Sequence, residues 1–341
     1  MRNNLISCIK YLLIITLSIF LWLVLYPRTY DVPQFKKRST TQYWELSTGS
    51  KIGYAKIPAT GIKKTYPIIF LQGGPGGPIF DKNIEVLSEF SKDGYDVYLY
   101  DQVGCGHSNR LENINEYTVE RHKRDLEEIV NVIGSPKVII IGQSWGAMLA
   151  MQYVTDHADK VEKIVLTGPG PILPINKELE KLNPPDSLKL KNSTFSNRQG
   201  NEKATNLRTR FVSYCARNFN LKIAGDEEMD DFATYWNYEL NKSVVFDTSK
   251  IHAPKAGYGY YMHVKTVQSF DKIPDKRQKL KNCNIPLLIL KGQYDSIKWG
   301  YLTEYLGFFT DHKLVIIPNA GHSITLEQPK LYIENITAFL N

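Results

Sequence analysis

Three polar residues of this sequence each lie shortly after an apolar, β-branched run, at widely separated places in the chain. Ser144 lies in GQSWG after KVIII, Asp295 ends GQYD after PLLIL, and His322 lies in AGHS after KLVII. A serine hydroxyl attacks a carbonyl group only when a base takes its proton, and the base needs an acid that orients it. Gly142 and Gly146 leave room for the sharp turn that presents a nucleophile between a strand and a helix. We therefore expect Ser144, His322 and Asp295 to act as nucleophile, base and orienting acid of one acyl-transfer site.

Such a site also needs N–H donors for the negative charge that develops on the attacked oxygen. The backbone amide of Trp145 directly follows the nucleophile, and Gly73 or Gly74 in QGGPGG supplies the second donor, because glycine lets the backbone approach a substrate. The glycine run gives little support to a phosphate-binding loop, since the lysine and hydroxyl of that motif are missing. The sequence has no metal-ligand spacing, so we expect neither a metal nor an organic cofactor.

The elements that position these residues follow from the apolar runs between them. Short β-branched runs with turn residues behind them are typical of strands that are buried on both faces of a parallel sheet. Residues 119–133 have helical spacing of apolar side chains, with Thr118 as N-cap and Gly134 as the end, and residues 43–57 predict a β-hairpin. Alternating strands and helices predict an α/β fold, and the chain order Ser, Asp, His is that of an α/β-hydrolase. We expect a mostly parallel sheet with helices on both faces.

The alternation stops near Gly170 and resumes near residue 284. The intervening stretch is polar, rich in aromatic residues and mostly helical in pattern, and it is too long for a bare loop. We interpret it as a helical cap inserted into the fold. The predicted parts are a membrane anchor and linker, the first part of the core, the helical cap and the second part of the core, at residues 1–40, 41–170, 171–283 and 284–341.

The N-terminus contains an apolar stretch without a charge from Tyr11 to Tyr26, which extends to Leu5 if Lys10 reaches the headgroups. Its length matches that of a membrane-spanning helix, so we predict a single-pass N-terminal anchor. A cleaved signal peptide is the alternative, but no small-residue cleavage site follows the stretch. Basic residues flank both ends and leave the orientation open. We expect the catalytic domain outside the cytoplasm.

The overall charge does not indicate a nucleic-acid partner. Of the net charge of +7, residues 1–38 carry +5, so the basic residues flank the anchor instead of forming a binding face. Cys8 lies in the anchor, and the other three cysteines form an odd number without metal-site or disulfide spacing. We expect free thiols.

Five segments together resemble one known family. QGGPGG, DQVGCGHS, GQSWGA, GQYD and AGHS are similar to motifs of the proline iminopeptidase branch of the α/β-hydrolases. The resemblance covers residues 43–170 and 284–341 and is much weaker in the cap. It implies a serine aminopeptidase that removes the first residue of a short peptide.

In that family, cap glutamates hold the free amino group of the substrate. The segment YWNYE is similar to the family's aromatic-x-x-Trp-Glu segment, so the resemblance implies that Glu239 is the amine anchor. The family's second glutamate is missing, since the corresponding stretch AGYGYYMHV has no acid. Gln72 stands where the family has histidine, and Val103 where it often has arginine. These departures leave the nucleophile and base intact and concern the part of the site that selects the substrate.

We therefore expect a membrane-anchored serine hydrolase that releases an N-terminal residue, such as proline, from short peptides through an acyl-enzyme. An esterase or lipase that uses the same triad on small acyl esters is the first alternative, and the missing cap acid favours it. A non-catalytic binding protein on a hydrolase scaffold is the second, but such proteins usually lose a triad member and this chain has lost none.

Overall fold

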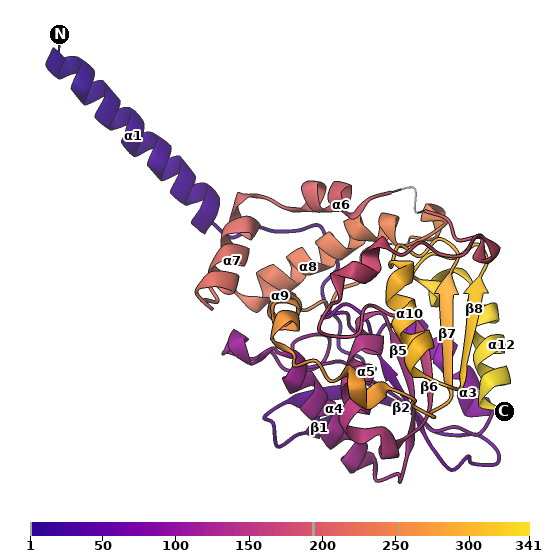
Figure 1. Cartoon of the computed structure of the whole chain (residues 1–341). Helices are drawn as coiled ribbons and strands as arrows, with labels where there is room; N and C mark the ends of the chain where they lie inside the picture. Colours follow the sequence, from indigo (N-terminus) through magenta and orange to yellow (C-terminus); the bar gives the residue numbers. More distant parts are fainter. Residues whose placement is uncertain (1, 193–194, 252) are drawn as a thin grey trace.

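In the computed structural model, which describes residues 2–192, 195–251 and 253–341, helix α1 (Arg2–Leu25) stands apart from a body that holds the remaining elements (Figure 1). Within α1, Ile6–Leu25 is long and apolar enough to cross a membrane, with a mean hydropathy of 2.4, and almost all of it is exposed. It is therefore not a buried core helix.

The strands of the body form one mixed sheet in the order β1-β2-β4-β3-β5-β6-β7-β8. The first two are the predicted hairpin, with Glu45 paired to Lys51, and β2 lies antiparallel to β4. All further pairs are parallel, as the continuous apolar runs predicted. The strands are β1 (Gln42–Glu45), β2 (Lys51–Ile57), β3 (Ile68–Leu71), β4 (Val97–Tyr100), β5 (Val138–Gln143), β6 (Val161–Thr167), β7 (Leu287–Gly292) and β8 (His312–Ile317).

Helices cover both faces of the sheet, which confirms the predicted α/β-hydrolase architecture. Successive residues of a strand point to opposite faces, so Ile69 and Leu71 pack in one apolar core and Ile68 and Phe70 in the other. The first core includes α4 (Val119–Ile133), α5 (Trp145–His157) and α10 (Trp299–Phe308); the second includes α2 (Asp81–Leu87), α3 (Glu89–Lys92), α11 (Ile324–Glu327) and α12 (Pro329–Leu340).

Helix α4 has the bounds that the sequence predicts. The Thr118 hydroxyl accepts a hydrogen bond from the amide of Arg121 at 3.1 Å, and Gly134 ends the helix with φ of +72°. Its buried side chains, such as Leu126, Ile129 and Val130, share one face.

Between β6 and β7 the chain leaves the sheet and forms helices above the carboxyl ends of the strands (Figure 1). They are α6 (Asn197–Ala204), α7 (Leu207–Asn218), α8 (Asp226–Leu240) and α9 (Tyr260–Gln268). No strand is assigned to this segment among its described residues, so it has the helical character expected of the cap.

The segment between α1 and β1 is packed against the body. The ring of Tyr30 lies 5.5 Å from that of Phe232, and the ring of Phe35 lies 4.8 Å from that of His107. The amide of Arg38 donates to Nε2 of His107 at 2.9 Å. This segment, expected to be a linker, thus belongs structurally to the folded domain.

Candidate active site

Ser144 lies on the sharp turn between β5 and α5 that the sequence predicts. Its backbone has φ of +53° and ψ of −114°, a conformation that side chains rarely adopt, and its amide donates to the carbonyl oxygen of Thr167 at 2.9 Å. A Cβ added to Gly146 would lie 2.0 Å from the carbonyl oxygen of Leu71, so only glycine lets α5 pack this close to β3. The turn presents Ser144 at the carboxyl edge of the sheet.

The predicted base and acid are in contact. His322 Nδ1 lies 3.0 Å from Asp295 Oδ1, which also accepts a hydrogen bond from the amide of Ile297 at 3.0 Å. Burial of Asp295 would raise its carboxyl pKa, but the positive charges of His322 and Lys291 and these hydrogen bonds lower that pKa well below its usual value. Asp295 therefore remains ionised beside the imidazole, and the part that His322 plays in taking up the serine proton stays a prediction.

Two residues that the sequence analysis missed support this pair. Lys291, fully buried in β7, places its ammonium 3.5 Å from Asp295 Oδ2, and Gly168 lies against the pair with φ of +51°. A Cβ at position 168 would lie 2.6 Å from His322 Nδ1. A lysine within an otherwise apolar strand, four residues before the predicted acid, was a sequence signal for a partner of Asp295.

The predicted oxyanion-hole residues surround Ser144. A Cβ added to Gly73 would lie 3.1 Å from Ser144 Cβ, and Gly73 and Gly74 line the same cavity as the serine. Trp145 is the first residue of α5, where N–H groups have no partner within the helix and the helix dipole is positive. Within the described ranges, no protein group accepts a hydrogen bond from the amides of Gly73 or Trp145. The role of these amides in binding an oxyanion stays a prediction.

Gln102, also missed by the sequence analysis, connects the two sides of this site. Its side-chain oxygen accepts from the indole nitrogen of Trp145 at 2.8 Å, and its side-chain nitrogen donates to the carbonyl oxygen of Gln72 at 3.0 Å. The neighbouring Asp101 accepts from the amide of Ile79 at 2.6 Å and contacts His107 Nδ1 at 2.8 Å. The loop after β4 therefore holds the glycine loop against the start of α5.

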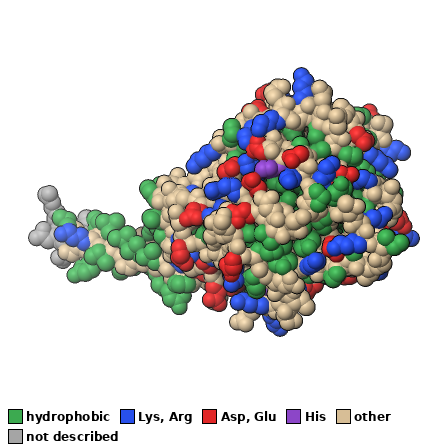
Figure 2. Space-filling view, turned by 90° about the horizontal axis from the view of Figure 1, so that it is seen from below, with side chains coloured by type: hydrophobic (Ala, Val, Ile, Leu, Met, Phe, Trp, Pro, Cys, Tyr) green, Lys and Arg blue, Asp and Glu red, His purple; other side chains and the backbone are tan. Residues whose placement is uncertain are grey.

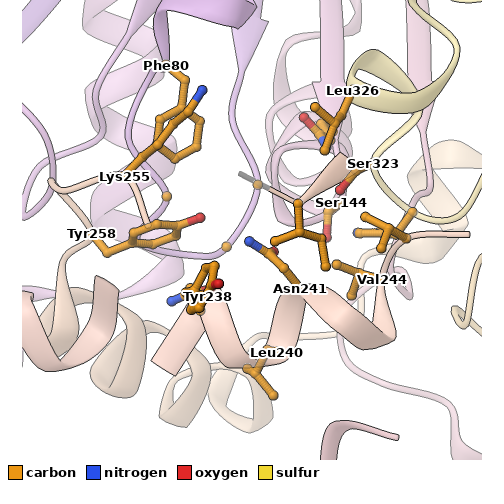
Figure 3. A pocket seen from close by; sticks show the side chains of 18 of the residues that line it. Phe80, Ser144, Tyr238, Leu240, Asn241, Val244, Lys255, Tyr258, Ser323 and Leu326 are labelled. Atoms are coloured by element: carbon orange, nitrogen blue, oxygen red, sulfur yellow. The ribbon is translucent and has the colours of Figure 1, made fainter. Parts of the chain in front are cut away.

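A cavity of about 400 Å³ opens above Ser144 and His322, between the core and the cap. Figure 3 shows Phe80, Lys255 and Tyr258 on one side of it and Ser144 and Ser323 on the other. The described lining residues include several side-chain amides and two lysines but neither Asp nor Glu. The described part of the cavity therefore offers a substrate apolar surface, neutral hydrogen-bonding groups and two lysine side chains, and no carboxylate.

The structure does not bring Glu239 to this cavity, which corrects the role implied by the resemblance. Its side chain is 4% exposed, and its carboxylate lies 2.7 Å from the ammonium of Lys203 and 3.3 Å from that of Lys242. Burial opposes its ionisation, but the two lysines outweigh this effect and lower its carboxyl pKa. Its neighbours Tyr238 and Leu240 line the cavity instead. Glu239 thus serves as a partner for cap lysines.

Gln72, which replaces the family's histidine, is buried beside the cavity. Its side-chain nitrogen donates to the carbonyl oxygen of Pro78 at 3.1 Å, while its side-chain oxygen has no described partner. Val103, which replaces the frequent arginine, is fully buried. Neither residue adds a charge to the site.

Comparison with known proteins agrees with this architecture. A family model described as the alpha/beta hydrolase fold matches residues 66–329. A protein of Heyndrickxia coagulans named proline iminopeptidase is 25% identical over 295 residues, which cover 86% of this chain and 96% of that protein.

Solved structures with the same fold include two enzymes of different names. An esterase from Exiguobacterium antarcticum superposes with a TM-score of 0.60 at 16% identity, covering 87% of this chain and 98% of that one. A proline iminopeptidase of Mycobacterium smegmatis does so with a TM-score of 0.57 at 16% identity, covering 88% of this chain and 97% of that one. At this identity the likeness concerns the fold alone.

Proposed function

This chain belongs to the alpha/beta hydrolase family, and from that premise we propose that it is a serine hydrolase that cleaves small, uncharged acyl esters. The observation that carries the proposal is that Ser144 and His322 line one cavity, with Asp295 in contact with His322, and that the described lining of this cavity has no carboxylate. The presence of a nucleophile, a base and an acid at one edge of the sheet argues against a purely binding role.

In the proposed reaction, Ser144 Oγ attacks the ester carbonyl carbon while His322 takes the serine proton. The amides of Trp145 and Gly73 or Gly74 stabilise the oxyanion, and His322 then protonates the departing alcohol. Water attacks the acyl-enzyme and transfers a proton to His322, which passes it to Ser144 Oγ as the acyl bond breaks and the carboxylic acid is released. Asp295 holds the imidazole and stabilises its charged form throughout.

The lack of a cavity carboxylate favours esters over peptides with a free amino group. An ammonium that leaves water for an apolar pocket needs a negative partner, because an unpaired buried charge is costly. Glu239 is paired with two lysines, and Lys255 adds a positive charge at the cavity. Lys255 would therefore repel a substrate ammonium, whereas an aminopeptidase needs a negative group that attracts it.

Release of an N-terminal residue is the second candidate, since curated relatives named proline iminopeptidase match over most of the chain. In this candidate the substrate amino group would bind in its neutral form, or as an ammonium that donates a hydrogen bond to a side-chain amide oxygen of the cavity.

The two candidates predict different activities of the full-length protein in detergent. We expect hydrolysis of 4-nitrophenyl acetate and butyrate, and kcat/KM at least about tenfold lower for the 4-nitroanilides of proline and alanine, a difference of about 1.4 kcal/mol in transition-state stabilisation. Ser144→Ala should lose both this activity and labelling by a fluorophosphonate probe. Faster cleavage of the anilides than of the esters would refute the ester proposal, and undiminished labelling of Ser144→Ala would refute the nucleophile.

We further propose that α1 is an uncleaved, single-pass membrane anchor with the catalytic domain outside the cytoplasm. Its last turn contacts the cap, since Arg208 donates to the carbonyl oxygens of Val24 and Leu25 at 2.9 and 2.8 Å. A removed signal peptide would leave this arginine without those partners. The protein should partition into detergent and retain its N-terminus in intact mass spectra, whereas a chain trimmed near Tyr26 would contradict the anchor.

A further inference from the structure

Exposed apolar side chains gather on the cap beside the base of α1. They lie on α7 and on the loop between α7 and α8, a group here called the α7 patch: Leu207, Tyr214, Phe219, Leu221 and Ile223, which are 37–57% exposed. Helix α7 lies at the edge of the body from which α1 emerges (Figure 1). In Figure 2, hydrophobic side chains continue from the helix onto the adjoining end of the body. So much exposed apolar surface in one place indicates a binding surface.

The end of α1 has the residues of a membrane interface. The rings of Trp22 and Tyr26 stack with 5.5 Å between their centres, and the guanidinium of Arg28 lies 5.2 Å from the centre of the Trp22 ring. Trp and Tyr are enriched at the headgroup level at both ends of membrane spans, and arginine extends its charge into the headgroups. A membrane crossed by α1 would therefore have its surface near residues 22–28.

The start of α7 lies at the same level. Arg208 donates to the carbonyl oxygens of Val24 and Leu25, within the turn that contains the interfacial aromatic residues. Leu207, the neighbour of Arg208, is 49% exposed. The α7 patch therefore begins where the apolar span ends.

The joint between α1 and the cap consists of hydrogen bonds from the chain around residues 24–28 to an ion pair of the cap. Arg208 is 4% exposed and forms a two-pronged ion pair with Glu228 on α8, which also accepts from the amide of Arg28 at 2.9 Å. Movement of α1 away from the cap would leave Arg208 without its two backbone acceptors and Glu228 without its backbone donor, which is costly for groups that are largely buried. The orientation of the cap relative to α1 is thus set by the fold.

We propose that the α7 patch is seated in the headgroup and acyl boundary of the membrane that α1 crosses. The inference rests on the proposed anchor and is independent of the substrate. Tyr214 and Phe219, in edge-to-face contact at 5.6 Å, would enter the boundary, and the exposed Arg210 and Arg217 on the same helix would meet lipid phosphates. The exposed acidic Glu227, just beyond Ile223, marks the edge of the patch.

This seating has a consequence for the catalytic cavity. Helix α8 binds the joint through Glu228 at one end and lines the cavity with Tyr238 near the other. Ten residues of α-helix separate them, a rise of about 15 Å. The cavity would therefore stay at a fixed and short distance from the lipid surface, where amphipathic esters concentrate.

The test uses the full-length protein in phosphatidylcholine vesicles with and without nitroxide-labelled lipid. A fluorophore is attached to a single cysteine placed at Phe219 or Leu221, with control cysteines at Val132 and Ile62, which are 58% and 92% exposed on the core. Because the proposed seating puts side chains about 5–10 Å deep, we expect at least about twofold quenching at both patch positions and no more than background at the controls. These chains carry Cys8→Ser and Cys283→Ser, and the two native cysteines that remain, Cys105 and Cys215, are buried. Fluorophosphonate labelling of Ser144 verifies the folding of these chains.

A separate chain labelled at the native Cys8, which is exposed on α1, reports on the anchor itself. Quenching at Cys8 without quenching at positions 219 and 221 would overturn the seating while leaving the anchor in place. An unquenched Cys8 would overturn the anchor, and the seating with it. A fluorescence change at 219 that follows protein density instead of nitroxide content would show contact between copies, and would also overturn the seating.

Discussion

Gly168 offers a direct test of the catalytic pair, because the fold leaves no room for a side chain there. It follows β6 with φ of +51° and lies against His322 and Asp295. A methyl group at this position would lie 2.6 Å from His322 Nδ1, 2.8 Å from its Cε1 and 2.9 Å from Asp295 Oδ2. The substitution Gly168→Ala should therefore displace the side chains of His322 and Asp295 without removing either residue.

Two magnitudes follow from this geometry. Relief of the contacts needs a movement of the imidazole of about 1 Å, and a misplacement of that size lowers catalysis by about 100-fold. The positive φ adds about 1–2 kcal/mol of backbone strain. We expect Gly168→Ala to lower both kcat for 4-nitrophenyl esters and the rate of fluorophosphonate labelling of Ser144 by about 100-fold, with little change in KM.

Gly61 supplies a matched control. It has φ of +81°, but a Cβ built there meets no described atom within 4 Å. Gly61→Ala should therefore lose a similar amount of stability, about 1–2 kcal/mol in urea unfolding, and keep full activity. If kcat and the labelling rate of Gly168→Ala stayed within about threefold of those of Gly61→Ala, the placement of the His322 and Asp295 side chains would be wrong, since a 1 Å shift should cost far more.

Other predictions test the supporting groups. Glu239→Gln should lower kcat/KM for esters and amino-acid anilides alike, by no more than about twofold, since the carboxylate does not face the cavity; a selective loss on the anilides would restore the amine-anchor role. The folded pKa of Asp295 is lowered, so its stabilising effect is present above about pH 4 and lost as pH falls through the folded value. The difference in unfolding free energy between the wild type and Asp295→Asn should therefore narrow between pH 5 and pH 3 in urea titrations, and a constant difference would contradict the charge-based stabilisation. Deletion of residues 1–26 should leave a folded enzyme, whereas deletion of residues 1–38 should lower its melting temperature in calorimetry, because it removes Tyr30 and its ring contacts; equal melting temperatures would mean that these contacts add nothing.

The parts of the site that depend on residues close together in the sequence could be predicted from the sequence. The nucleophile turn depends on a strand, two glycines and a following helix, all contiguous in the chain, so its position follows from the sequence around Ser144. The parallel sheet then brings the loops with Asp295 and His322 to the same edge, because carboxyl ends of parallel strands meet there. The helix 119–133 was equally local, with its cap, apolar face and terminal glycine within one segment.

The supporting contacts could not be predicted in this way, since they join residues far apart in the chain. Gly168 contacts His322 and Asp295, which lie more than a hundred residues later in the sequence. Arg208 contacts Val24 at the end of α1, which lies 184 residues earlier. The segment after α1 was expected to be a linker because it is polar around Lys36. Only the fold reveals that the ring of Tyr30 contacts Phe232 of the cap and that the ring of Phe35 contacts His107 of the core.

Glu239 shows that a local sequence similarity can identify a residue type without showing in which direction its side chain points. The cavity-lining residues Thr234, Asn237, Tyr238 and Asn241 have the spacing i, i+3, i+4, i+7, which places them on one face of a helix. At about 100° per residue, position 239 lies roughly 150° from the centre of that face. Once α8 is a regular helix with that face on the cavity, Glu239 must point into the cap, where Lys203 neutralises it. An amine anchor at this position would require a break in the helical phase between residues 234 and 239, and the helix runs unbroken from Asp226 to Leu240.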